Sequence, residues 1–243
     1  MPTSDQEHLT EISDLNIRSL DILARALHVK SAELEPTLQA IVSTAVRMLS
    51  PARYAGLIIF SRGELIPQAS TDRVPLLLDH LQQKLGDGPC VNAAQSQSIV
   101  QIDDTRQDGR WPDFAADAAS LGVRSMLCVP LSVDERCLGA LSLYADQAAA
   151  FTDLHGRVTS LLATFAALAL AEAQRADQLT AALINRDVIG QAKGILMERH
   201  GITADAAFGY LTRVSQAENT KLAAIAAQLV ATGELPIATS PDP

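Results

Sequence analysis

The chain has 243 residues, of which 48% are hydrophobic and 4% aromatic, and its net charge is −9. The length suits one large domain or two ordinary ones. The negative charge argues against indiscriminate nucleic-acid binding, so any such binding needs a local patch. No apolar run approaches the roughly 20 residues that cross a bilayer. The polar N-terminus, MPTSDQEHLTEISD, resembles neither a signal nor a transit peptide. We expect a cytoplasmic protein without a membrane partner.

Three cysteines without CxxC spacing predict reduced thiols rather than a disulfide framework or a zinc site. The sequence contains no HExxH, GxSxG or P-loop motif, and its five histidines are scattered. Asp103, Asp104 and Asp108 are close enough in sequence to suggest a metal, although an acidic loop explains them more simply. We therefore expect no enzymatic activity, no cofactor and no metal site.

Residues 1–30 predict a helical leader, and residues 31–150 a domain of mixed periodicity. The expected elements of that domain are helix 31–49, strands 54–60 and 64–70, helix 74–84, a glycine loop at 85–90, strand 98–102, a loop and helix within 103–119, and strands 124–131 and 137–144. Helices mixed with hairpins in this order predict an α+β domain around an antiparallel sheet of five or six strands.

Residues 151–183 predict one long helix. Its apolar residues recur in alternating steps of three and four, which is heptad spacing. They are Phe151, Leu154, Val158, Leu161, Phe165 and Leu168. The next two positions of this seam, Glu172 and Arg175, are polar and weaken it. We expect a dimerising signalling helix, with a coiled coil through Phe151–Leu168 that makes the protein a homodimer.

Residues 184–236 predict a three-helix bundle, followed by a disordered tail at 237–243. The first helix should stop at His200-Gly201, and Thr203 should cap the second. The expected inner face of the second helix consists of Ala204, Ala207, Phe208, Leu211 and Val214. Asn219-Thr220 should cap the third helix, which ends near Gly233 and Pro236.

The first helix of this bundle contains the stretch NRDVIGQAKGILMERHG at 185–201. One side carries an apolar stripe, and the other carries Arg186, Gly190, Lys193, Gly194 and Met197. Each glycine inside a helix costs about 0.8–1 kcal/mol relative to alanine. A bare helix face between basic side chains would admit an anionic backbone. It would equally admit a tightly packed helix, and the spacing alone leaves both open.

Two resemblances add to this reading. Leu183 to Met197 (LINRDVIGQAKGILM), with Ala206-Ala207-Phe208, Asn219, Leu222 and Ile225-Ala226, closely resembles the ANTAR domain over about 50 residues. ANTAR proteins are transcription antitermination regulators that bind paired RNA stem-loops in nascent transcripts, usually as dimers. Residues 31–150 resemble the GAF sensor domains fused to ANTAR in actinobacteria. That resemblance rests on Leu85-Gly-Asp-Gly-Pro-Cys90, Arg110-Trp111-Pro112, Gly122-Val-Arg-Ser125 and Val129-Pro-Leu131.

The resemblance implies RNA contacts at Arg186, Gly190, Gln191, Lys193, Gly194, Met197 and Asn219. For Asn219, helix capping alone is the alternative. It also implies a small-molecule or protein signal at the GAF domain, for which the candidate residues are Gly86, Gly88, Cys90 and Trp111. That loop could equally be a plain turn, and Cys90 a small packed residue or a redox-sensing thiol. The asparagine-lysine-phenylalanine-aspartate-glutamate motif of cyclic-nucleotide GAF domains is absent.

The expected fold is therefore α+β: a GAF domain, a long coiled-coil helix and a C-terminal three-helix ANTAR bundle. The expected function is signal-responsive transcription antitermination through binding of a two-hairpin RNA. The alternative is a small-ligand-sensing scaffold whose helical tail binds a protein partner or DNA. Residues 180–235 carry five basic and five acidic side chains, and this neutral balance favours the alternative slightly.

Overall fold

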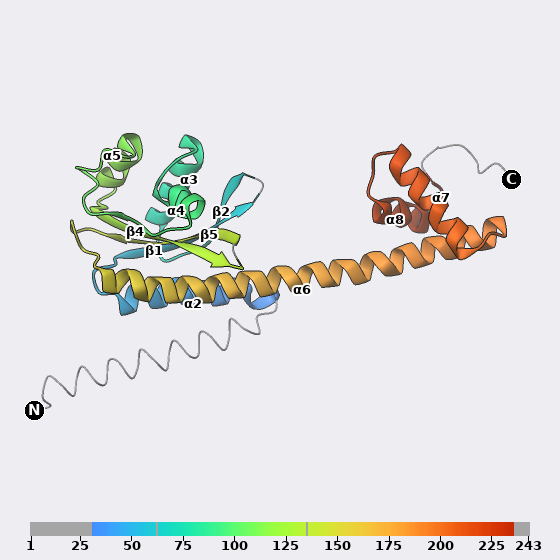
Figure 1. Cartoon of the computed structure of the whole chain (residues 1–243), viewed down its shortest axis with the longest axis horizontal. Coiled ribbons are helices and arrows are strands. Elements are labelled where there is room, and N and C mark those ends of the chain that lie inside the picture. Colours follow the sequence, from blue (N-terminus) through green and yellow to red (C-terminus); the bar gives the residue numbers. More distant parts are fainter. Residues whose placement is uncertain (1–30, 62, 135, 236–243) are drawn as a thin grey trace, which may run out of the picture. The chain divides into compact units, whose positions relative to one another are not determined.

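The computed structural model describes residues 31–61, 63–134 and 136–235 (Figure 1). The expected leader at 1–30 and tail at 237–243 lie outside these residues. Internal contacts divide the chain into two compact units that meet between Gln174 and Arg175. The two units are described separately.

The N-terminal unit contains the expected antiparallel sheet flanked by helices. Its elements are α2 (Ser31–Met48), β1 (Tyr54–Ser61), β2 (Glu64–Ser70), α3 (Arg73–Leu85), α4 (Pro89–Ser96), β3 (Val100–Ile102), α5 (Pro112–Ser120), β4 (Ser125–Val133), β5 (Arg136–Ala145) and the first part of α6 (Asp153–His200). The five strands are ordered β2-β1-β5-β4-β3, and all neighbours are antiparallel. Helix α4 begins inside the expected glycine loop, because Pro89 suits a first helical turn.

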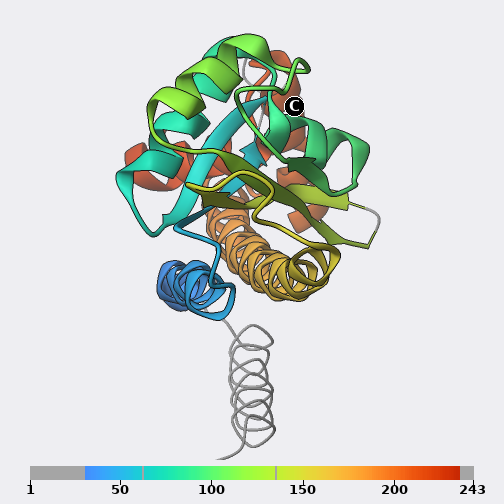
Figure 2. The same cartoon turned by 90° about the vertical axis from the view of Figure 1, so that its left-hand side faces the viewer.

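Both faces of the sheet are covered, and each face has its own core. Along β4 and β5, alternate residues such as Leu127 and Leu141 contact the layer formed by α2 and α6. The residues between them, such as Met126 and Tyr144, contact α3, α4 and α5 on the other face. Figure 1 shows the two layers of helices, and Figure 2 shows α2 and α6 as separate rods under one face. Successive residues along these strands therefore point to opposite faces of the sheet, and both faces are buried.

Helix α6 packs on the sheet through a face rich in alanine. Leu162, Ala166 and Leu170 are at most 1% exposed there. By length and composition alone, α6 is apolar enough to cross a membrane, because one 18-residue window in it has a mean hydropathy of 1.4. Half of that window is buried inside the protein, as in the core helix of a globular domain.

The expected heptad seam is divided between two environments. Phe151 and Phe165 are buried in the core under the sheet, so these two positions do not point outward as expected. Leu154 and Leu161 are exposed, by 61% and 46% respectively. The seam therefore contributes partly to the domain's own core and partly to an open apolar surface.

The C-terminal unit is the expected three-helix bundle, made of the end of α6, α7 (Ala204–Ala217) and α8 (Leu222–Thr232). Its core consists of Ala192, Leu196, Ala207, Leu211, Val214, Ile225, Ala226 and Leu229. Gly201, at φ +63°, follows the last residue of α6. The side chain of Thr203 accepts a hydrogen bond from the Ala206 amide at 3.3 Å, which confirms the expected cap.

Two expectations for this unit were wrong. Phe208 is 44% exposed rather than on the inner face of α7. Asn219 does not cap α8, whose N-cap position is Lys221. Instead, Asn219 adopts a left-handed conformation with φ 47° just after the end of α7. Asparagine tolerates this conformation better than most residues, so Asn219 ends one helix instead of starting the next.

The middle of α6 is exposed to solvent. Every residue from 177 to 187 is helical and exposed. Leu179, Leu183 and Ile184 are 58–63% exposed within this stretch. These large apolar side chains on an isolated helical surface are the most exposed hydrophobic group of the unit.

Candidate functional sites

The predicted RNA face lies on the surface of α6. Arg186, Gly190, Gly194 and Met197 are exposed, and Lys193 is half-buried. On the opposite side of the helix, Ala192 and Leu196 lie in the bundle core. The structure therefore brings the five predicted residues together on one outward face, with the predicted apolar stripe turned inward.

The two glycines on this face have open space in front of them. A Cβ placed on Gly190 or Gly194 would meet no atom within 4 Å among the described residues. A tight helix contact would place backbone or side-chain atoms there. Among the described residues, therefore, nothing packs tightly on these two glycines.

Around Gly190 the surface forms an open depression of about 480 Å³. It is lined by Leu183, Arg186, Asp187, Gly190 and Gln191, which all come from α6. The Gln191 side-chain amide donates to Asp187 Oδ2 at 3.0 Å, so both groups are oriented along the helix. No carboxylate in the described part of the chain pairs with Arg186 or Lys193. Both cations therefore remain available to an anionic partner.

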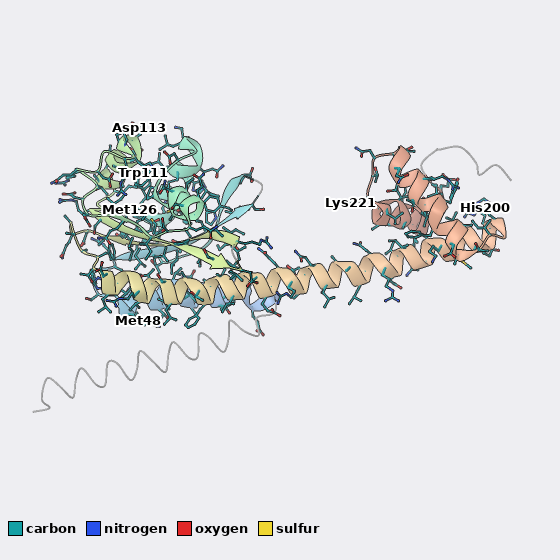
Figure 3. The ribbon with its side chains drawn as sticks, viewed as in Figure 1. Met48, Trp111, Asp113, Met126, His200 and Lys221 are labelled. Atoms are coloured by element: carbon teal, nitrogen blue, oxygen red, sulfur yellow. The ribbon has the colours of Figure 1, made fainter. Side chains whose placement is uncertain are left out.

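Arg199 and Tyr210 have structural contacts within the bundle. Arg199 Nη1 donates to the Gly233 carbonyl at 2.6 Å and so ties α6 to the end of α8. Tyr210 packs against the bundle core, with the Arg213 guanidinium 5.7 Å from its ring centre. Figure 3 shows His200 at the end of α6 and Lys221 at the start of α8. Asn219 is exposed in the turn between α7 and α8, so it is not part of the α6 face.

In the GAF-like unit, the predicted ligand loop packs on its own domain. Gly86 caps α3 in the left-handed conformation with φ 69°. A Cβ on Gly88 would lie 2.5 Å from the side chain of Gln82, so this glycine permits a close approach to Gln82. Gln82 is fully buried, and its Oε1 accepts a hydrogen bond from the Cys90 amide at 2.8 Å. Sequence analysis did not single out Gln82, although it organises the loop.

Trp111 holds the same loop from the other side. Its indole Nε1 donates to Asp87 Oδ1 at 3.1 Å, and Asp87 also accepts from the Gly88 amide at 2.7 Å. The Arg110 guanidinium lies 4.6 Å from the centre of the indole. Figure 3 shows Trp111 and Met126 on one side of the sheet, opposite Met48. The four predicted ligand residues are therefore neighbours, and the contacts described around them are made by the protein's own Gln82 and Asp87.

Two of the three carboxylates in the acidic loop at 103–108 pair with arginines. Asp104 pairs with Arg124 at 2.8 Å, and Asp108 pairs with Arg110 at 2.6 Å. Hydrogen bonds from these arginines are the largest cause of the lowered pKa of each carboxyl group. Across the described ranges, no group of three or more acidic, histidine or cysteine side chains could hold a metal ion.

A polar cluster lies in the core between the sheet and α3–α5. It consists of Asp79 and Gln82 from α3, Cys90 from α4, Cys128 from β4, and Ser142 and Tyr144 from β5. The Cys90 Sγ lies 3.0 Å from Ser142 Oγ, 3.1 Å from Gln82 Nε2 and 3.7 Å from Cys128 Sγ. These six side chains form the most polar part of an otherwise apolar core.

Burial governs the ionisation of this cluster. Burial is the largest cause raising the pKa of the Asp79 carboxyl group and of the Tyr144 hydroxyl group well above their ordinary values. The Tyr144 hydroxyl makes no hydrogen bond with the described residues. The pKa of Cys90 falls to about 7, chiefly through its hydrogen bond with Cys128, with further lowering by Ser142 and Gln82. The same contact is the largest cause raising the pKa of Cys128.

Solved structures with a similar fold support the architecture of the N-terminal unit. A putative GAF sensor protein from Burkholderia vietnamiensis is 17% identical with a TM-score of 0.52, covering 68% of this chain and 98% of its own. The type II free methionine-R-sulfoxide reductase from Thermoplasma acidophilum is 21% identical with a TM-score of 0.51, covering 58% and 94%. The free methionine-R-sulfoxide reductase from Neisseria meningitidis is 17% identical with a TM-score of 0.51, covering 72% and 96%. At these identities the likeness concerns the fold alone.

Family comparisons identify both parts of the chain. No curated protein sequence matches it significantly. A GAF domain profile matches residues 31–171, more than half of the chain, and an ANTAR domain profile matches residues 177–230. Both domains are regulatory, the first associated with small-ligand sensing and the second with RNA-binding antitermination. The chain therefore belongs to the GAF family and carries an ANTAR domain after its GAF domain, the arrangement of a GAF and ANTAR regulator.

Proposed function

We propose that this protein is a signal-responsive transcription antiterminator in the cytoplasm. Its ANTAR domain binds paired stem-loops in nascent mRNA through the outer face of α6. Its GAF domain receives a small-molecule or protein signal that controls this binding. The proposal includes no catalytic step, because neither domain needs one to regulate RNA binding.

One observation carries the RNA-binding proposal: two open glycines share a helix face with two cations, and neither cation has an ion-pair partner among the described residues. Gly190 and Gly194 have no side chain to hold a ligand away from the helix backbone. Arg186 and Lys193 lie on the same face and can contact phosphate groups or base edges. RNA stem-loops offer both phosphates and splayed loop bases. The face therefore combines close approach with positive charge.

The other proposed contacts refine this interface. The Gln191 amide, oriented by Asp187, can hydrogen-bond a base edge after modest reorientation. Met197, 38% exposed, offers an apolar contact to an unstacked base. Asn219 lies on a separate turn and is proposed as a secondary contact. With only two principal cations, the proposed interface should depend on shape more than on bulk charge.

We further propose that the protein binds RNA as a homodimer through α6. Leu154 and Leu161 are exposed in the GAF unit, while Leu179, Leu183 and Ile184 are exposed in the ANTAR unit. Pairing of such side chains with those of a second copy would remove apolar surface from water. A dimer also carries two ANTAR domains, matching the two stem-loops of a paired target. The signal acts at the loop of Gly86, Gly88, Cys90 and Trp111.

The second candidate is a sensing scaffold whose helical tail binds a protein partner or DNA. The exposed Leu179, Leu183 and Ile184 favour a protein partner, because they form an apolar rather than a basic surface. This candidate makes a different prediction for the glycine face. Loss of positive charge there should leave binding of an apolar partner almost unchanged.

The deciding experiment is a fluorescence titration of the full chain with a two-hairpin RNA, a single hairpin and a DNA duplex of matched length. We expect tighter binding to the two-hairpin RNA, with a dependence on salt. Lys193→Ala should weaken binding and flatten the slope of log affinity against log salt by about 0.7, one phosphate contact. Lys221→Ala, at the start of α8, is the matched control and should leave the slope unchanged. Equal binding to duplex DNA, or equal losses in both variants, would contradict the proposal.

A further inference from the structure

The two cysteines of the buried polar cluster are placed as a reactive pair. Cys90 is the second residue of α4, and Cys128 lies in β4, 38 residues further along the chain. Both are fully buried, and their sulfur atoms are 3.7 Å apart. A disulfide bond is about 2.0 Å long, so the sulfurs need to approach by about 1.7 Å. Helix α4 packs directly on β4, so a small movement of this helix supplies that approach.

The surroundings of the two sulfurs are unequal. Gln82 Nε2 donates to Cys90 Sγ at 3.1 Å, and the Ser142 hydroxyl group lies 3.0 Å from the same atom. The N-terminus of α4 adds the positive end of a helix dipole. These groups favour a thiolate at Cys90, consistent with its pKa of about 7. Asp79 and Tyr144 face the same site, and their raised pKa values keep negative charge away from it.

The third cysteine has none of these features. Cys137 is half-buried in β5, and its thiol donates to the Gly139 carbonyl at 3.2 Å. It is therefore more accessible than Cys90 and Cys128, but it lacks a nearby sulfur among its hydrogen-bond partners. Cys137 is therefore an internal control for the oxidation of Cys90 and Cys128. Simple exposure favours oxidation of Cys137, whereas the built geometry favours Cys90 with Cys128.

We propose that Cys90 and Cys128 form an oxidation site in which hydrogen peroxide converts the two thiols into an intramolecular disulfide bond. The Cys90 thiolate attacks one peroxide oxygen; the S–O bond forms, the O–O bond breaks, and the departing hydroxide takes a proton to become water. The Cys128 sulfur then attacks the Cys90 sulfenic sulfur. The S–S bond forms, the S–O bond breaks, and the hydroxide leaves with the Cys128 proton as a second water molecule. Two thiols and one peroxide give one disulfide and two waters.

The burial of Cys90 and Cys128 limits which oxidants can reach them. Both thiols are fully buried, so an oxidant reaches them only through local opening of the helical layer. A molecule close to water in size needs a smaller opening than a peptide disulfide such as oxidised glutathione. The site should therefore respond to peroxide and not to glutathione disulfide. The resulting bond would join α4 to the sheet beside the loop that Gln82 and Trp111 hold.

The test is peptide mapping of the full chain by mass spectrometry, without reduction, after treatment with one equivalent of hydrogen peroxide. We expect a crosslinked peptide pair containing Cys90 and Cys128, a mass loss of two hydrogen atoms, and a free Cys137 thiol. Cys128→Ser should stop at the Cys90 sulfenic acid, seen as a mass gain of one oxygen atom on the peptide that contains Cys90. Cys137→Ser is the matched control and should form the crosslink at the wild-type rate.

Three results would overturn the proposal. They are oxidation of Cys137 while Cys90 and Cys128 remain thiols, a disulfide that joins two chains instead of two sites in one chain, and equal crosslinking rates with peroxide and with oxidised glutathione. The wild-type map answers the question even if a variant fails to fold. Circular dichroism of each variant establishes whether its result can be compared with the wild type.

Discussion

Alanine at Gly190 and at Gly194 should stabilise the ANTAR domain and weaken RNA binding. Both glycines lie inside α6, and a Cβ at either position meets nothing within 4 Å. Each substitution should therefore gain the full difference in helix propensity, about 0.8–1 kcal/mol. If the domain unfolds separately, about 1 kcal/mol corresponds to a rise of about 4–8 °C in melting temperature for a domain of this size. The added methyl groups should meanwhile hold the RNA away from the helix backbone.

The assay can distinguish the two domains because the chain has a single tryptophan, Trp111, in the GAF domain. Tryptophan fluorescence follows unfolding of the GAF domain, while circular dichroism follows helix loss in both domains. The change seen only by circular dichroism reports the ANTAR domain. RNA titrations well below the melting temperature then measure affinity in the same samples.

Two other glycines provide matched controls. Gly209 lies in α7 with equally open space, so Gly209→Ala should stabilise the bundle without loss of RNA affinity. Gly201 also has open space, but its φ of +63° is strained for alanine, so Gly201→Ala should destabilise by about 1 kcal/mol. Lower ANTAR melting temperatures for both Gly190→Ala and Gly194→Ala, with unchanged RNA affinity, would refute the argument. That outcome would indicate a face packed on another protein surface, where overpacking costs about 1–3 kcal/mol.

Three further predictions concern the dimer and the GAF domain. Leu161→Glu should give a monomer in sedimentation at micromolar concentration, with little loss of domain stability. Leu162→Ala, at a fully buried site, should instead lower the free energy of unfolding by about 2–5 kcal/mol. A wild type that is already monomeric would contradict the prediction for Leu161. Asp79 has a raised pKa in the folded protein, so its stabilising contribution is present below its unfolded pKa and is lost as pH rises through the folded value. Asp79→Asn should therefore gain stability relative to wild type by up to about 1.4 kcal/mol per pH unit above pH ~4, measured by urea unfolding across pH, and a constant difference would exclude this cause. Trp111→Phe should lose the hydrogen bond to Asp87 and destabilise the GAF domain by about 1 kcal/mol, while leaving the ANTAR transition unchanged. Urea unfolding of this variant is followed by circular dichroism, because the variant contains no tryptophan.

Periodicity predicted most of the fold, because each element has one dominant apolar repeat. It did not predict the buried polar cluster. Ser142 alternates with Leu141 and Leu143 in β5, a pattern typical of a strand with one solvated face. Here the second face is covered by α3–α5, so the polar member of the alternation is buried. A hydroxyl group is tolerated there because Ser142 Oγ lies within hydrogen-bonding distance of Cys90 Sγ.

The two errors in the bundle have local causes. Ala207, Leu211 and Val214 form the narrow stripe of α7 that fills the core. Phe208 lies about 100° around the helix from Ala207, so it falls outside this stripe. Asn219 belongs to a residue type favoured both before a helix and in the left-handed position after one. Residue type alone therefore could not decide which helix Asn219 serves. For the predicted RNA face, the sequence placed the residues on one side of α6, but only the structure shows that no described residue packs on the two glycines.

The exposed stretch of α6 from 178 to 187 has a consequence for local stability. Ten exposed helical residues are too few to form a stable helix in water by themselves, since about 12–15 residues are marginal even in favourable sequences. Their backbone hydrogen bonds depend on the packed turns at either end. Amide hydrogens there should exchange with solvent sooner than those of the flanking turns, and the bond after Arg186 should be an early site of tryptic cleavage. Slowed exchange and cleavage confined to this stretch would thus record, residue by residue, any partner that covers it.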